Sequence, residues 1–323
     1  MKISIAMATF NGEKYIDEQL SSFLSQTRLP DELIVTDDCS SDRTEEIVRA
    51  FSEKAPFEVL FSKNEYNVGY CANFNNALTR ATGDLVFLSD QDDVWFPEKI
   101  DMISALAEKK PHVMAFMNNA ALTDEDLSPL GTTKLGQLHS AGFGSDSFVM
   151  GCCMAVKREL LDLSMPIHPK FKSHDGWLSW FADGLGEKLI IDEVLQYYRR
   201  HNSNASWFVA NSTKKINKIK FYYSTAVRLF KSESAKRDAY QIEQYEYFVE
   251  GVIGAKSKAR EGVGSKLDLL ISRSLETLNI MKARAEIRKR RFGGRFIGVL
   301  RLIIAGEYRK LNGFKSIAKD LIG

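Results

Sequence analysis

The chain has 323 residues, a net charge of +2 and 44% hydrophobic residues, which is ordinary for a globular protein with a large core. No apolar run reaches about 18 residues, so no membrane-spanning helix is expected, and no signal peptide is recognised at the start of the chain. The four cysteines have neither disulfide-framework nor zinc-site spacing, so we expect reduced thiols in a cytoplasmic protein.

Short apolar runs alternate with amphipathic segments in the first part of the chain. Strands are predicted at residues 2–7, 33–36, 57–61, 85–88, 113–117, 151–156 and 194–198, and helices begin near residues 15, 42, 73, 97, 157 and 177. Strands that alternate with helices of about ten to fifteen residues imply βαβ units and a mainly parallel sheet. The sequence therefore predicts an α/β fold.

The charge is divided unevenly along the chain. Residues 212–323 hold 25 Lys and Arg against 11 Asp and Glu, a net charge of +14, so residues 1–211 carry −12. This division predicts two domains with different partners, a body of residues 1–211 and a basic region of residues 212–323. The basic region has a helical pattern, with tyrosines and leucines set among charges and no strand alternation.

Three loops follow predicted strands: Thr9–Gly12, Asp37–Ser41 and Asp90–Asp93. Ligands of parallel sheets bind beyond the carboxyl ends of the strands, so these loops are expected to converge on one crevice. The last loop places three carboxylates within four residues, which is unfavourable unless a cation neutralises them. Mg²⁺ or Mn²⁺ prefers such oxygen ligands. A solvated acidic turn is the alternative, and the convergence of the loops favours the metal site.

Glycine-rich phosphate-binding loops are missing from the sequence. There is no G-x-G-x-x-G after the first strand and no G-x-x-x-x-G-K-[ST] at any position, so a dinucleotide dehydrogenase and a P-loop NTPase are disfavoured. A sugar-phosphate nucleotidyltransferase shares the sheet architecture, but it needs a glycine-rich basic loop that residues 8–12 lack. A nucleoside diphosphate would therefore need the metal as its anchor.

Four short motifs follow one another in this part of the chain. They are Ala8-Thr9-Phe10-Asn11-Gly12, Asp37-Asp38-Cys39-Ser40-Ser41-Asp42, Asn67-Val68-Gly69 and Ser89-Asp90-Gln91-Asp92-Asp93-Val94-Trp95-Phe96-Pro97. In this order they resemble the motifs of family 2 glycosyltransferases, which are inverting, metal-dependent enzymes. The resemblance implies the GT-A fold, a Rossmann-like α/β unit. The family more often has glycine at the position of Cys39, so the backbone there is expected to avoid a positive φ.

Two later motifs, His174-Asp175-Gly176-Trp177 and Tyr198-Arg199-Arg200-His201-Asn202, resemble the bacterial rhamnosyltransferase-like branch of this family. That branch builds cell-wall rhamnan, O-antigen and capsule chains. The resemblance implies transfer from dTDP-rhamnose or a UDP-sugar to a saccharide acceptor, which in such enzymes is usually lipid-linked. A non-catalytic polysaccharide-binding or scaffold protein is the alternative, and two intact carboxylate sites argue against it.

The resemblance also implies a nucleotide pocket. Asp38 would accept a hydrogen bond from the pyrimidine N3–H, and the backbone of Thr9, Phe10 and Asn11 would line the base. Asp90 would face the ribose or hold a metal-bound water. For Asp37 and Asp38 the alternative role is to shape the turn and cap the following helix.

The remaining roles concern the metal and the reaction. By resemblance, Asp92 binds the metal directly, while His201 and Arg199 approach the metal or the diphosphate from the far side. Asp175 is the candidate general base, and its alternative role is the N-cap of the helix that follows it. Asp93 is expected to cap the helix that begins near Pro97.

Two basic segments lie in the C-terminal region. Lys214–Lys220 precede three aromatic residues, and Arg288–Ile304 mixes arginines with aromatic and aliphatic residues. This second profile is typical of a segment that lies in the interface of an anionic membrane, which predicts a peripheral protein at the inner face of the cell membrane. A helix packed on the body or on another copy is the alternative, and nucleic-acid binding is not expected.

Overall fold

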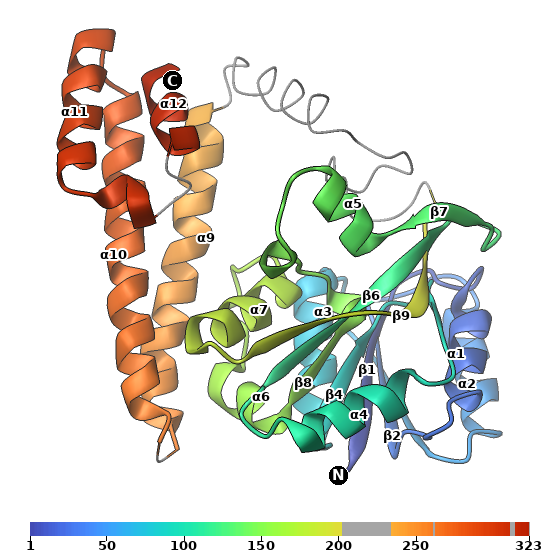
Figure 1. Ribbon diagram of the computed structural model, residues 1–323. Helices are drawn as coiled ribbons and strands as arrows, with labels where there is room; N and C mark the ends of the chain where they lie inside the picture. The colour runs from blue at the N-terminus through green and yellow to red at the C-terminus, as the bar shows by residue number, and fades with distance from the viewer. Residues whose placement is uncertain (202–233, 261, 311–313, 323) are drawn as a thin grey trace. The chain divides into compact units, whose positions relative to one another are not determined.

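The computed structural model describes residues 1–201, 234–260, 262–310 and 314–322 (Figure 1). The chain divides into two compact units, Met1–Lys218 and Ile219–Gly323. The first unit has an α/β architecture and the second is helical. The basic segment at residues 214–220 lies outside the described residues.

The strands of the first unit form one sheet. In the described part of this unit their order is β3-β2-β1-β4-β8-β6-β9-β5, and β7 pairs with β6 at the side. Their bounds are β1 Ile3–Thr9, β2 Glu32–Asp37, β3 Glu58–Lys63, β4 Leu85–Ser89, β5 Val94–Trp95, β6 Ala115–Thr123, β7 Pro129–Thr133, β8 Met154–Lys157 and β9 Lys188–Arg199. The predicted α/β fold is confirmed.

The first four strands of the sheet, β3-β2-β1-β4, are all parallel. Their carboxyl ends therefore lie along one edge, as the βαβ pattern predicts. Beyond β4 the sheet is mixed, because β8 is antiparallel to β4 and β6 whereas β9 is parallel to β6. The long strand β9 also pairs with the short strand β5, in which Val94 lies opposite Tyr197. This pairing brings the end of β9 beside the loop that follows β4.

Helices cover both faces of the sheet (Figure 1). One face packs against α1, α2 and α4 through a fully apolar cluster. On the other face α3 contacts β1 and β2, while α6 and α7 pack together and α7 also contacts α3. The helix bounds are α1 Ile16–Leu24, α2 Thr44–Ser52, α3 Tyr70–Arg80, α4 Lys99–Lys109, α5 Lys134–Ser140, α6 Arg158–Ser164 and α7 His174–Leu185, with short 3₁₀ turns at Ser145–Ser147 and Gly151–Cys153.

Two local expectations were wrong. Helix α3 begins at Tyr70 rather than near residue 73, because Gly69 adopts a φ of +84° just before it and the Asp38 carboxylate accepts the Gly69 N–H at 2.8 Å. Cys39 has a φ of +66°, although the absence of glycine had predicted a negative value. Its thiol donates to the Asn64 carbonyl at 3.0 Å, so a tertiary contact holds the left-handed conformation.

The described part of the second unit consists of a helical hairpin and two shorter helices. Helices α9 and α10 pack side by side, and α11 and α12 pack against α10 and each other (Figure 1). Buried Asp320 of α12 joins this helix to α10 and to the 3₁₀ turn Glu307–Lys310. It pairs with Arg284 at 2.6 Å and with Arg288, and it accepts the Tyr308 hydroxyl at 2.8 Å. The predicted helical character is confirmed. The bounds are α9 Ser234–Ala255, α10 Gly264–Arg288, α11 Phe292–Ile304 and α12 Phe314–Ile322, with 3₁₀ turns at Lys256–Lys258 and Glu307–Lys310.

None of the helices in the described ranges combines the length and the apolar content that crossing a membrane requires.

Candidate active site

The acidic loop between β4 and β5 lies at the carboxyl edge of the parallel strands. Asp93 is fully buried in this loop, and its carboxylate accepts the Gln196 side-chain amide at 2.9 Å and the Arg199 backbone N–H at 3.3 Å. The expectation that Asp93 caps the next helix was wrong, because α4 begins at Lys99 and Asp93 bonds to β9 instead. Asp93 therefore fastens the acidic loop to β9.

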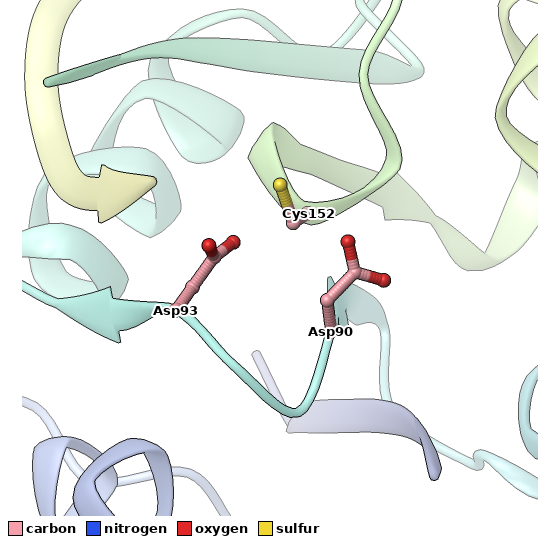
Figure 2. A group of neighbouring side chains, drawn as sticks. All are labelled: Asp90, Asp93 and Cys152. Carbon is pink, nitrogen blue, oxygen red and sulfur yellow. The ribbon is translucent and has the colours of Figure 1, made fainter. Parts of the chain in front are cut away.

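Asp90 and Asp93 lie on either side of Cys152 (Figure 2). One ligand atom of each residue lies within 4.8 Å of those of the other two. Burial and then the charge of Asp92 raise the pKa of Asp93 to about 7, and the same causes raise the pKa of Asp90 well above its usual value. Burial also raises the pKa of the Cys152 thiol, which keeps the sulfur protonated.

This donor set fits a hard divalent cation. Crowded carboxylates destabilise one another when they are ionised, and a cation between them removes that repulsion. Mg²⁺ and Mn²⁺ prefer oxygen ligands, and a protonated thiol is a poor ligand for either ion. Of these three residues, Asp90 and Asp93 therefore offer ligand atoms that suit such an ion, whereas the Cys152 thiol does not.

Asp92 and His201 meet at this loop. The His201 Nε2 atom lies 2.8 Å from Asp92 Oδ2, and both side chains are largely buried. The imidazole ring also packs against Tyr15 of the segment before α1, with the ring centroids 4.7 Å apart. Two residues that are 109 positions apart in the chain thus form one pair. The structure brings the two predicted metal residues together.

Arg199 lies under the loop and has only 2% of its surface exposed. Its guanidinium donates to the backbone carbonyls of Asp92 at 2.9 Å and Glu125 at 2.5 Å, and it pairs with Glu18. It also lies over the Tyr15 ring, 4.7 Å from the centroid. Through these contacts Arg199 fixes the backbone of the acidic loop.

Lys99 is a buried cation that the sequence analysis missed. Its ammonium donates to Gln196 Oε1 at 2.5 Å and to the Cys152 carbonyl at 3.0 Å, and it lies 3.8 Å from the Trp95 ring centroid. Burial lowers the pKa of Lys99 to about 8. Gln196 in turn donates to Asp93. Lys99 therefore supports both the acidic loop and the Gly151–Cys153 turn, and only its place in the fold reveals this role.

Asp175 lies in the first turn of α7 and is partly exposed. The N-cap of this helix is Ser173, whose Oγ accepts the Gly176 N–H at 3.1 Å, so the alternative N-cap role of Asp175 is excluded. Asp175 Oδ1 accepts the Ser173 hydroxyl at 2.6 Å and the Gly176 N–H at 2.8 Å. Within the described residues, Oδ2 accepts no hydrogen bond. The carboxylate is thus oriented through one oxygen while the other stays available.

His174 is buried beside Asp175, and burial lowers its pKa. The ring stacks on Phe74 of α3, with the centroids 3.9 Å apart, and its Nε2 lies against Gly151. An ideal Cβ at Gly151 would come 2.5 Å from this nitrogen and 3.5 Å from the Cβ of Asp175. The glycine therefore lets the Gly151–Cys153 turn approach α7. Asp175 and Asp90 consequently flank the same turn.

Asp37 and Asp38 both shape the loop after β2. Asp37 accepts the hydroxyls of Thr9 at 2.8 Å and Ser40 at 2.5 Å. Asp38 accepts the backbone N–H groups of Val68 at 2.7 Å and Gly69 at 2.8 Å, and the Asn64 amide at 3.0 Å. Asp38 is buried, and these three donors occupy three of the about four acceptor sites of its carboxylate.

The loop after β1 is tied to the acidic loop by Gln91, which the sequence analysis also missed. The Gln91 amide accepts the Phe10 N–H at 2.8 Å and donates to the Phe10 carbonyl at 3.0 Å. Asn11 has a φ of +47°, and its side chain accepts the Ser41 N–H at 2.9 Å. The Phe10 ring is half exposed. The predicted loops of β1, β2 and β4 therefore meet at one edge of the sheet.

Helix α3 connects the Asp38 side of this edge to Asp175. Its first residue follows Gly69, which Asp38 binds, and the Tyr70 hydroxyl donates to the Lys172 carbonyl just before α7. Burial, and then the negative charge of Asp175, raises the pKa of Cys71 to about 12. Asp38, the acidic loop and Asp175 are thus linked through α3 and lie around one region.

Comparison with known proteins agrees with this arrangement. Residues 4–163 match the sequence profile of Glycosyl transferase family 2. An uncharacterized glycosyltransferase, MJ1057, of Methanocaldococcus jannaschii is 34% identical over 228 residues, which cover 68% of this chain and 76% of that protein. The chain belongs to glycosyltransferase family 2. This glycosyltransferase is also 29% identical over 222 residues to the Escherichia coli UDP-Glc:alpha-D-GlcNAc-diphosphoundecaprenol beta-1,3-glucosyltransferase WfgD, with 67% of this chain and 83% of WfgD covered.

Solved structures support the fold. The crystal structure of S. aureus TarS 1–349 in complex with UDP-GlcNAc superposes with a TM-score of 0.55 at 19% identity, and covers 88% of each chain. Similarity at this identity shows the fold alone. The predicted GT-A fold of this glycosyltransferase is confirmed.

Proposed function

We propose that this glycosyltransferase moves a sugar from a pyrimidine nucleoside diphosphate to a saccharide hydroxyl with inversion of configuration, in the synthesis of a cell-surface polysaccharide. The observation that supports this most strongly is that Asp90 and Asp175 flank the same Gly151–Cys153 turn. An inverting transfer needs a site for the departing diphosphate on one side of the sugar and one base on the other. In this proposal Asp90 would lie on the diphosphate side and Asp175 on the acceptor side.

The donor is a UDP-sugar or dTDP-rhamnose. The free acceptor capacity of Asp38 suits the N3–H of uracil or thymine and disfavours cytosine, which has no hydrogen at N3. The backbone of Thr9, Phe10 and Asn11 would line the base. Asp90 would face the ribose. The name of the relative WfgD gives UDP-Glc as its donor.

Mg²⁺ or Mn²⁺ is the proposed cofactor, with Asp92 as a ligand, Asp90 beside it and His201 within reach. A bound divalent ion supplies charge neutralisation for the leaving nucleoside diphosphate. In this proposal Arg199 is a positioning residue for the acidic loop, because its guanidinium is buried and occupied by Asp92, Glu125 and Glu18. It holds the Asp92 backbone in place, so that the Asp92 carboxylate can bind the metal.

Asp175 is the proposed general base. Its Oδ2 would take the proton from the acceptor hydroxyl while that oxygen attacks the anomeric carbon, and the bond to the diphosphate breaks on the opposite face. General base catalysis of this kind contributes about 10²–10⁴ in rate. Ser173 and the Gly176 N–H hold Oδ1 and so aim Oδ2 toward the acceptor.

The donor and the metal are tested by binding. Thermal shifts of the full chain would be measured with UDP-sugars, dTDP-rhamnose and GDP-mannose, with Mn²⁺ or with EDTA. We expect a Mn²⁺-dependent shift with a pyrimidine donor that Asp92→Asn abolishes and the exposed control Asp126→Asn retains. Full metal-dependent binding by Asp92→Asn would contradict the ligand assignment.

The base is tested by transfer rates to a saccharide acceptor. Asp175→Asn should lower kcat by about 10²–10⁴ and leave the donor affinity within about threefold, since this residue acts on the acceptor side. Exposed Asp162→Asn on α6 is the matched control. A normal rate with Asp175→Asn would place the base elsewhere.

We further propose that the acceptor is lipid-linked and that catalysis resides in residues 1–211, while residues 212–323 bring the enzyme to the inner face of the cell membrane. The name of the relative WfgD gives a diphosphoundecaprenol-linked acceptor. The basic C-terminal region carries the positive charge that an anionic membrane attracts.

A further inference from the structure

Helix α11 packs against α10 through Gly298, Val299 and Leu302, and it leaves five large apolar residues exposed on another face. Gly298 packs so closely on α10 that an added Cβ would come 2.7 Å from Ile287 Cγ1. The neighbouring Val299 is buried in the same contact. In an ordinary surface helix the face opposite the core is polar, whereas in α11 that face is also apolar.

The outward arc of α11 carries only apolar residues. At 100° per residue, five large side chains fall within about 120° of one another, together with Gly293. Between 42% and 78% of the surface of each side chain is exposed. They are Phe296, Ile297, Leu300, Ile303 and Ile304.

Arginines lie before this arc and at one of its edges. Arg290 and Arg291 lie exposed just before the helix, and Arg301 is exposed at the edge of the arc. The sequence between Glu286 and Glu307 contains no acidic residue. A second copy of the chain placed face to face on this arc would bring like charges together, whereas an anionic lipid surface offers charges of the opposite sign.

We propose that the outward face of α11 inserts into the headgroup region of an anionic membrane, with the neighbouring arginines bound to lipid phosphates. Apolar residues in the acyl boundary and arginines at the phosphates are the arrangement of an interfacial helix. This inference rests on the proposed membrane function for its purpose, and it names the surface that performs it.

The test is flotation of the full chain with vesicles of phosphatidylglycerol and phosphatidylcholine, and with phosphatidylcholine alone. We expect binding to the anionic vesicles only. The double variant Ile297→Glu/Leu300→Glu should lower the bound fraction by about tenfold or more, because each substitution replaces an inserted apolar group by a charge that lipid phosphates repel. The matched control Ile253→Glu/Leu269→Glu changes exposed residues of α9 and α10 and should bind normally.

Arginine contacts are tested separately. Arg290→Glu/Arg291→Glu should weaken flotation and reduce its dependence on salt, because fewer lipid phosphates are neutralised. Equal flotation of the α11 double variant and its control would overturn the proposal. A wild-type dimer that the α11 variant converts to a monomer, measured by light scattering without vesicles, would also overturn it, with a second copy as the occupant.

Transfer to a short, lipid-free acceptor distinguishes this proposal from the enzymatic one. The α11 variant should keep the wild-type rate with that acceptor. A chain that floats as expected but transfers no sugar would refute the proposed function and leave the membrane face standing. A chain that transfers sugar but does not float would refute the membrane face and leave the proposed function standing.

Discussion

Gly12 and Gln91 provide a direct test of how the loop after β1 is coupled to the acidic loop. The Gln91 amide makes two hydrogen bonds to the Phe10 backbone, at 2.8 and 3.0 Å. A Cβ added at Gly12 would come 2.6 Å from Gln91 Cδ. Gly12→Ala must therefore displace the amide and break both bonds.

The cost follows from these two bonds. A typical hydrogen bond contributes about 0.5–1.5 kcal/mol net, and Gln91 is half-buried, so the displacement should cost about 1–2 kcal/mol. Gln91→Ala removes the same two bonds. In the Gln91→Ala background the added methyl meets no amide, so Gly12→Ala should then cost less than about 0.5 kcal/mol.

The assay is a double-mutant cycle measured by urea unfolding of the four proteins. The restriction of the unfolded chain by alanine is the same in both backgrounds, so it cancels in the cycle. We expect a coupling of about 1–2 kcal/mol and a raised donor KM in each single variant. Gly254→Ala, where an added Cβ meets no atom within 4 Å, is the control and should not destabilise the protein. An equal cost of Gly12→Ala in both backgrounds would refute the coupling.

Three further perturbations test the remaining contacts. Lys99→Met leaves the buried acceptors of Gln196 and Cys152 without their donor, so urea unfolding should show a loss of about 2–4 kcal/mol, and a loss below about 1 kcal/mol would contradict the supporting role. Gly151→Ala forces the first turn of α7 to move. The kcat should therefore fall about tenfold or more, while Mn²⁺-dependent donor binding persists. An unchanged kcat would mean that α7 accommodates the added methyl group without moving Asp175. Burial opposes ionisation of Glu32, but hydrogen bonds from its neighbours outweigh burial and lower its pKa from 4.5 to about 2. The stabilisation by Glu32, about 2–3 kcal/mol, is therefore present above pH 4.5 and is lost as the pH falls toward 2. In unfolding experiments, Glu32→Gln should lack this part of the stability that the wild type loses in acid. An identical pH profile of the two proteins would contradict the assignment.

Local patterns were sufficient to predict the architecture. The alternation of apolar strands and amphipathic helices determined the α/β unit, because burial of apolar faces sets the period of each element. The position of the acidic loop after β4, and of Asp175 at the start of α7, could also be predicted, because motifs follow strand ends and helix starts. The helical character of the described residues of the C-terminal region followed in the same way.

Only the tertiary structure decided what each of the clustered carboxylates contacts. Asp93 is fastened to Gln196, 103 positions away, and Asp92 meets His201, 109 positions away. Lys99 of α4 donates a hydrogen bond to Gln196 at the site. The apolar arc of α11 is turned away from α10 because Gly298 packs against Ile287. In sequence Asp90, Asp92 and Asp93 are equivalent acidic residues. They acquire different roles through the strand pairing of β5 with β9 and the packing of helices, which no short stretch of sequence determines.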